Sequence, residues 1–140
     1  MLERVGISLE DTLLKKFDTL IERRGYANRS EAIRDLIRDQ LVQEEWSERG
    51  QDNGEKVAVV SIVYDHDSSS LSQKLTHIQH ENHRAVVSAL HVHLDPHNCL
   101  EVLILRGKAK EIISMGESLV STKGVKYGKV MPATTGRGLD

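Results

Sequence analysis

Two histidines and the only cysteine of the chain form its clearest group of potential metal ligands. The order is His91-Val92-His93, followed by five residues and then Cys99. In a β-strand, His91 and His93 would point to the same face, because side chains alternate along a strand. Residues 95–98 are rich in turn formers, so we expect Cys99 to begin the next strand of a hairpin. Two imidazoles and one thiolate would then converge on a rigid element.

Thiolate and imidazole donors restrict the metal that this group could bind. They suit nickel, copper or zinc and exclude calcium and magnesium. A square-planar site would indicate nickel or copper and a tetrahedral site zinc, and the sequence does not distinguish them. A single histidine or a lone buried cysteine more often has no metal role, but the joint pattern favours a metal site. A fourth ligand has five candidates among the other histidines: His66, His77, His80, His83 and His97.

The elements that would position these ligands follow the order β-α-β-β-α-β, which is typical of the ferredoxin-like fold. The expected strands span 56–64, 84–94, 99–105 and 125–131, and the expected helices span 71–82 and 109–122. We therefore predict an α+β chain whose C-terminal domain, residues 56–132, has this fold. Residues 133–140 are expected to be a disordered tail.

The first 46 residues indicate a strand followed by two helices. Residues 2–9 alternate between apolar side chains and small or polar ones, as in a half-buried strand. One helix would end at Gly25, and the next would begin near Asn28. A lone strand has no backbone partner, and so short a segment cannot bury a sufficient core. We therefore predict an obligate dimer that pairs its strands and interlocks its helices.

Composition and charge set the broad class of the protein. Hydrophobic residues make up 39% and charged residues 29% of the chain, as in soluble globular proteins. No apolar segment is long enough to cross a membrane, and a single cysteine excludes an internal disulfide, so we expect a cytoplasmic protein. The net charge of −2 does not by itself suggest a nucleic-acid partner.

Residues 47–55 are polar and are predicted to be a linker.

Two separate motifs resemble those of the nickel-responsive regulators of bacteria and archaea. The first is RSEAIRD at 29–35, and the second is LHVH at 90–93 followed by CLE at 99–101. The resemblance extends from Glu3 to about Met131. It implies a ribbon-helix-helix DNA-binding domain at 1–46 and a ferredoxin-like, ACT-type domain after the linker. It also implies a homotetramer, in which two ribbon-helix-helix dimers flank a central core.

The same resemblance implies the ligands and the function. His91, His93 and Cys99 would bind one Ni(II) per subunit in a square plane with His80 of the partner subunit. Glu101 would not bind the metal itself but would hold these ligands in their orientation. The protein would be a transcriptional repressor that binds operator DNA when nickel is bound, with nickel uptake genes as its targets. It would not be an enzyme, and no nucleophile–base pair, P-loop or dinucleotide-binding motif is present.

The resemblance assigns DNA contacts to two segments. The paired strands would enter the major groove, which accepts a two-stranded ribbon, and the start of the second helix would hold phosphate. The implied contact residues are Arg4, Gly6 and Ser8 on the strand and Asn28, Arg29 and Ser30 at the helix start.

The chain departs from the family at two places that concern DNA. Gly6 stands where other members carry a hydroxyl residue, and it offers no side chain to a base. Ser68 and Ser69 stand where some members have a basic pair, so we expect weaker nonspecific attraction to the DNA backbone there. The operator sequence of the family therefore does not transfer to this chain.

Glu31 and Asp35 are four residues apart on the expected second helix. The resemblance implies a secondary cation site there, between the two domains. The alternative is a surface pair whose charge is balanced by Arg34 and Arg38.

Two other functions compete with the nickel sensor. A ferredoxin-like regulatory domain could bind an amino acid instead, with the histidine–cysteine group incidental or zinc-structural. The chain could also be a metal storage protein, a metallochaperone or a metalloenzyme. That second class gives no role to the outward residues of the N-terminal strand, and a duplex-binding assay would separate it from a DNA-binding regulator.

Overall fold

The computed structural model describes residues 1–46 and 54–140. The chain divides into two compact units, Met1–Leu41 and Val42–Asp140, which are considered separately below. Most of the expected linker, 47–55, lies outside the described residues. No helix among the described residues is both long and apolar enough to cross a membrane.

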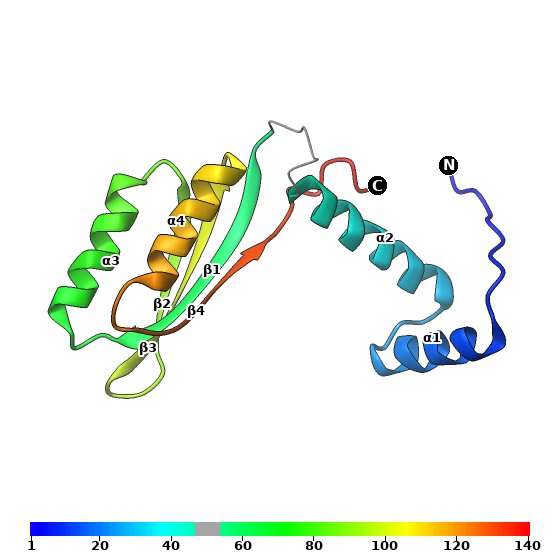
Figure 1. Ribbon diagram of the computed structural model, residues 1–140, viewed down its shortest axis with the longest axis horizontal. Coiled ribbons are helices and arrows are strands. Elements are labelled where there is room, and N and C mark those ends of the chain that lie inside the picture. The colour runs from blue at the N-terminus through cyan, green and yellow to red at the C-terminus, as the bar shows by residue number, and fades with distance from the viewer. Residues whose placement is uncertain (47–53) are drawn as a thin grey trace. The chain divides into compact units, whose positions relative to one another are not determined.

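The C-terminal unit contains a four-stranded antiparallel sheet with two helices on one face (Figure 1). The strand order is β2-β3-β1-β4, so the first and third strands of the unit occupy its centre. This arrangement confirms the α+β, ferredoxin-like expectation, and each element lies within two residues of its expected bounds. The elements are β1 (Lys56–Asp65), α3 (Ser69–Glu81), β2 (Val86–His93), β3 (Asn98–Gly107), α4 (Ala109–Ser121) and β4 (Val125–Pro132).

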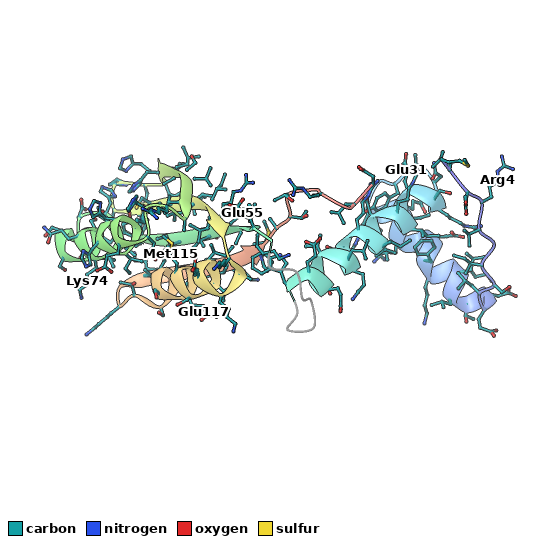
Figure 2. The ribbon with its side chains drawn as sticks, turned by 90° about the horizontal axis from the view of Figure 1, so that it is seen from above. Arg4, Glu31, Glu55, Lys74, Met115 and Glu117 are labelled. Atoms are coloured by element: carbon teal, nitrogen blue, oxygen red, sulfur yellow. The ribbon has the colours of Figure 1, made fainter. Side chains whose placement is uncertain are left out.

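The core of this unit lies between the sheet and its two helices. Every second side chain of β1 is buried, as expected for a strand with one covered face. Close packing of α4 on the sheet requires Gly116, because an added Cβ there would lie 2.8 Å from Cγ2 of Val130. Figure 2 shows Met115 on α4 beside this core. The fully buried side chains of the core include Val60, Ile62, Leu75, Cys99, Leu103, Leu105, Ile112 and Leu119.

The opposite face of the sheet carries no helix and exposes apolar side chains. Val59 of β1 pairs with Ile104 on one side and Met131 on the other, and Val63 pairs with Tyr127. Ile104 is 39% exposed, Met131 56% and Tyr127 60%. Ser61 and its partner Lys129 interrupt this face, but exposed apolar side chains in such number are typical of a surface that another protein chain covers.

The N-terminal unit contains α1 (Asp11–Arg23) and most of α2 (Arg29–Trp46). The predicted end of the first helix is confirmed: Gly25 has φ of 75°, and the N–H of Tyr26 donates to the carbonyl oxygen of Ile21 at 3.0 Å. The start of the second is confirmed by the N–H of Glu31, which donates to the side-chain oxygen of Asn28 at 2.9 Å.

The expected strand at residues 2–9 is not formed within the single chain. These residues belong to no strand, and the side chains of Val5 and Ile7 are 81% and 61% exposed. A strand is defined by hydrogen bonds to a neighbour, and the described part of one chain offers none for this segment. The helices are similarly open, since Ala32 is the one buried residue of α1 and α2.

Candidate metal centre

The β2–β3 hairpin brings the expected ligands to neighbouring positions. His93 pairs with Cys99 and His91 pairs with Glu101, so all four side chains lie on the helix-covered face. The rings of His91 and His93 are stacked with their centroids 5.7 Å apart. The ligand atoms of His91, His93 and Cys99 do not all lie within 4.8 Å of one another in the described chain. The hairpin thus aligns the three side chains but does not close them into a finished site.

The thiol of Cys99 is hydrogen-bonded inside the core. It is fully buried and donates a hydrogen bond to the carbonyl oxygen of Tyr64 at 3.4 Å. Burial raises the pKa of this thiol above its usual range, and the hydrogen bond to Tyr64 opposes part of that effect. Metal binding would therefore have to displace the thiol proton and break this hydrogen bond.

Glu101 is a buried carboxylate with a complete set of partners. The hydroxyl of Tyr64 donates to Oε2 and the side-chain amide of Gln79 donates to Oε1, each at 2.7 Å. Nδ1 of His91 lies 3.9 Å from Oε2. Burial and the hydrogen bond to Glu101 raise the pKa of Tyr64, so its hydroxyl remains a donor. A carboxylate beside Nδ1 leaves Nε2 of His91 as the ring nitrogen free to bind a metal.

A further imidazole, that of His66, adjoins this face. Its ring meets that of His93 edge-on, with centroids 4.8 Å apart. Its Nδ1 is buried and has no hydrogen-bond partner in the protein. Buried polar atoms are rarely left unpaired, so this nitrogen is a ligand atom without a ligand in the chain itself. Two aligned imidazoles, an adjacent thiol and this nitrogen fit nickel, copper or zinc and do not fit calcium or magnesium.

His80 lies on the exposed part of α3. Gln79 faces the sheet, where it holds Glu101, whereas His80 is exposed. Successive residues of a helix point about 100° apart, which follows from 3.6 residues per turn. A shallow surface hollow next to His80 is lined by Ser72, Gln73, Thr76 and His77. The described chain therefore does not bring His80 to His91, His93 and Cys99.

The residues expected to contact DNA lie in the N-terminal unit. Arg4, Gly6 and Ser8 are exposed in the extended segment before α1, and Figure 2 shows the side chain of Arg4 projecting from it. A Cβ added to Gly6 would meet nothing within 4 Å. Arg29 begins α2 and makes a two-point ion pair with Asp18 of α1, at 2.8 and 2.9 Å. This pair lowers the pKa of Asp18 and raises that of Arg29.

Glu31 and Asp35, the expected secondary cation pair, have different surroundings. The hydroxyl of Tyr26 donates to Asp35 at 2.9 Å, and Arg38 lies 3.8 Å from its other oxygen. Figure 2 shows Glu31 near the start of α2. No third histidine, cysteine or carboxylate of the described chain gathers with them into a ligand group.

Comparison with known proteins identifies the family. A model described as the NikR C terminal nickel binding domain matches residues 57–133, and one for ribbon-helix-helix proteins of the copG family matches 3–44. The chain belongs to the nickel-responsive regulators. A member from Anaeromyxobacter sp. (strain K) is 72% identical, and one from Geobacter metallireducens is 55% identical. The alignment with the Anaeromyxobacter protein covers 99% of each chain. The alignment with the Geobacter protein covers 97% of this chain and 96% of the relative.

The fold of the C-terminal unit also occurs in a more distant structure. An uncharacterized protein from Thermotoga maritima matches 58% of this chain and 100% of its own length, with a TM-score of 0.52 and 15% identity. At that identity the likeness concerns the fold alone.

The site of this nickel-responsive regulator includes residues that the sequence analysis did not find. Tyr64 and Gln79 hold Glu101, and Asp18 holds Arg29. The alternation of β1 indicates that Tyr64 shares a face with Ile62, which would have placed it toward the hairpin. Gln79 and Asp18 carry no such signal, because their partners lie 22 and 11 residues away.

Proposed function

We propose that the chain is a nickel-dependent transcriptional repressor. His91, His93 and Cys99 would bind one Ni(II) per chain, completed by His80 of the partner subunit, and Glu101 would orient His91. The observation that carries this proposal is the hairpin register, which places His93 beside Cys99 and His91 beside Glu101 on one face. Thiolate and imidazole donors are suited to nickel, which would link two subunits when bound.

The orientation of α3 supports a ligand shared between subunits. The bond from Gln79 to Glu101 fixes the rotation of the helix near its end. His80 then faces outward beside a surface hollow, where the hairpin of another subunit could reach it. An intersubunit site makes assembly depend on the metal, which a sensor requires.

Exposed apolar surface supports a homotetramer. The open face of the sheet and the apolar sides of α1 and α2 are uncovered in the single chain. Each unit therefore has one exposed apolar surface, and a dimer of dimers would bury both. One surface would form the central core, and the other would form each ribbon-helix-helix pair.

The N-terminal unit supports contact with double-stranded DNA. Paired strands would present Arg4, Gly6 and Ser8 to the major groove, where an arginine can bind guanine through two hydrogen bonds. The start of α2, with Asn28, Arg29 and Ser30, would face phosphate with its free N–H groups. A protein of this kind acts in the cytoplasm, and nickel uptake genes are the proposed targets because the relatives are described as nickel-responsive regulators.

The first test is a titration of the metal-free protein with Ni(II), followed by ultraviolet–visible absorption. We expect thiolate-to-nickel charge-transfer bands that saturate at one Ni(II) per chain and are absent in Cys99→Ala. His80→Ala should also weaken nickel binding, whereas His77→Ala, on the same exposed side of α3, should not. Wild-type absorption without these bands, or bands unchanged in His80→Ala, would contradict the proposed ligand set.

The second test measures the coupling between nickel and DNA. Binding to genomic fragments upstream of nickel uptake genes should tighten when nickel is added, by about 5- to 150-fold for a coupling of about 1–3 kcal/mol. Cys99→Ala should bind the same fragments without this change. Equal affinity with and without nickel would leave a metal protein that is not a nickel-dependent repressor.

A further inference from the structure

A second group of potential metal ligands lies at the end of β1, apart from His91, His93 and Cys99. One ligand atom each from Asp65, Asp67 and His97 lies within 4.8 Å of the others. Among the described residues, this is the one group of three histidine, cysteine or carboxylate side chains whose ligand atoms already lie this close together. In Figure 1 the β2–β3 turn lies beside the end of β1, which explains how His97 reaches the two aspartates.

Backbone hydrogen bonds hold this group in place. The N–H of His66 donates to the carbonyl oxygen of His97 at 3.0 Å, which joins the two segments. The N–H of Asp67 donates to Oδ1 of Asp65 at 2.9 Å. The turn is fixed by Asp95, whose side chain accepts bonds from the N–H groups of His97 and Asn98 at 2.8 and 2.7 Å. Ligands on a restrained backbone lose little entropy when they bind a metal.

The donors include nitrogen as well as oxygen, which separates this group from an ordinary acidic cluster. Nδ1 of His97 lies 3.0 Å from Oδ2 of Asp67, and Nε2 of His66 lies 3.4 Å from Oδ1 of the same carboxylate. Two imidazoles therefore flank one carboxylate, and a second carboxylate adjoins it. The other ring nitrogen of His66, Nδ1, is buried without a hydrogen-bond partner and belongs to the hairpin side of the ring's surroundings, so His66 adjoins the second group through Nε2 alone.

We propose that Asp65, Asp67 and His97 form a second site for a divalent transition-metal cation, with the imidazole of His66 beside it. Carboxylates suit Mn(II), imidazoles suit zinc and nickel, and the group contains no sulfur. A cation there would fasten the end of β1 to the β2–β3 turn. The ring of His66 also touches that of His93, so the second site adjoins the hairpin histidines without sharing them.

The test uses the full chain, first loaded with one equivalent of Ni(II), and then titrated with Mn(II). Manganese favours oxygen-rich sites over thiolate, and its electron paramagnetic resonance signal reports the free ion directly. We expect one Mn(II) bound per chain. Asp67→Asn and His97→Gln should each weaken Mn(II) binding by about tenfold or more, as loss of a ligand-shell partner costs 10–100-fold.

The matched control is Glu81→Gln. Glu81 pairs with His77 at 3.1 Å on the exposed surface of α3, which resembles the His97–Asp67 pair but belongs to no group of three. Glu81→Gln should bind Mn(II) as the wild type does, because it leaves Asp65, Asp67 and His97 in place. Circular dichroism checks that each variant is folded. Mn(II) that stays free at millimolar concentration, or equal binding by Asp67→Asn and the wild type, would overturn the second site and leave the thiolate site unaffected.

Discussion

The carboxylate of Glu101 shows how single residues prepare the hairpin for a metal. It is 6% exposed, and a polar group so deep in a protein requires hydrogen-bond partners. Tyr64 and Gln79 supply them from β1 and α3, so three elements fix one side chain. Nδ1 of His91 lies 3.9 Å from this carboxylate. The contacts that fix Glu101 therefore extend beyond the proposed metal ligands.

Tyr64→Phe tests this network in the metal-free protein. The change removes the hydroxyl that donates to Oε2 of Glu101 and leaves the packing of the ring intact. Because a buried acceptor is left unpaired, we expect the free energy of unfolding to fall by about 1–3 kcal/mol. Tyr127→Phe is the control: Tyr127 is 60% exposed, and we expect a change within about 0.5 kcal/mol. Urea unfolding measures both, and equal effects would show that the Tyr64 hydroxyl does not stabilise Glu101.

Sequence reasoning predicted the hairpin residues and Glu101 but not Tyr64 and Gln79, which hold Glu101. His91, His93 and Cys99 stand out because their spacing matches the period of a strand, and Glu101 entered through the family motif. Gln79 is an ordinary helix residue until the rotation of α3 is known. The side-chain rotamer of Cys99 also depends on a local hydrogen bond, which no sequence pattern encodes.

At the scale of elements, the corner between α1 and α2 depends on the ion pair of Asp18 with Arg29. The pair ties the middle of one helix to the start of the next and fixes the guanidinium where we propose phosphate to bind. Asp18 has a pKa below its ordinary value of 3.8 because Arg29 donates to it. Its contribution to stability is therefore present above about pH 4 and is lost as the pH falls through the lowered pKa.

Asp18→Asn should accordingly lower the urea midpoint of unfolding at pH 7 by a small amount. Both groups are exposed, so solvent screening keeps the effect modest. The difference from the wild type should shrink as the pH falls below 3.8 and through the lowered pKa, because Asp18 becomes protonated first in the unfolded state and then in the folded state as well. Asp39→Asn, on the exposed surface of α2, serves as the control. A difference that is constant from pH 7 to pH 3 would show that charge pairing is not its cause.

The boundaries of the elements could be predicted wherever the sequence carries a periodic pattern or a cap. Gly25 and Asn28 mark the two helices as expected, and all six elements after residue 55 were placed within two residues. The strand at residues 2–9 stays a prediction. Its alternating pattern is clear, but the hydrogen bonds that define a strand would come from a second copy of the chain.

At the scale of the whole molecule, the N-terminal unit has too little buried surface to be stable alone. The helices α1 and α2 contain 13 and 18 residues, near the length at which an isolated helix is marginal in water. Ala32 is their one buried residue, and large side chains such as Leu36 and Ile37 are 46% and 53% exposed. Helices with this pattern gain stability when an apolar face is covered, which the proposed dimer would provide.

Ile7→Asp and Ser8→Asp place the same charge on opposite faces of the N-terminal segment. In the proposed dimer Ile7 faces the core, so a carboxylate there would be buried without a partner and would prevent pairing. We expect Ile7→Asp to lose helical circular dichroism from α1 and α2 together with DNA binding. Ser8→Asp should keep the helical signal and lose DNA binding alone, because its charge would repel the phosphates. Both should still bind one Ni(II) per chain, since the hairpin ligands lie in the other unit. Full helical signal in Ile7→Asp would mean that the two helices are stable without paired strands, and the dimer proposed for this unit would be wrong.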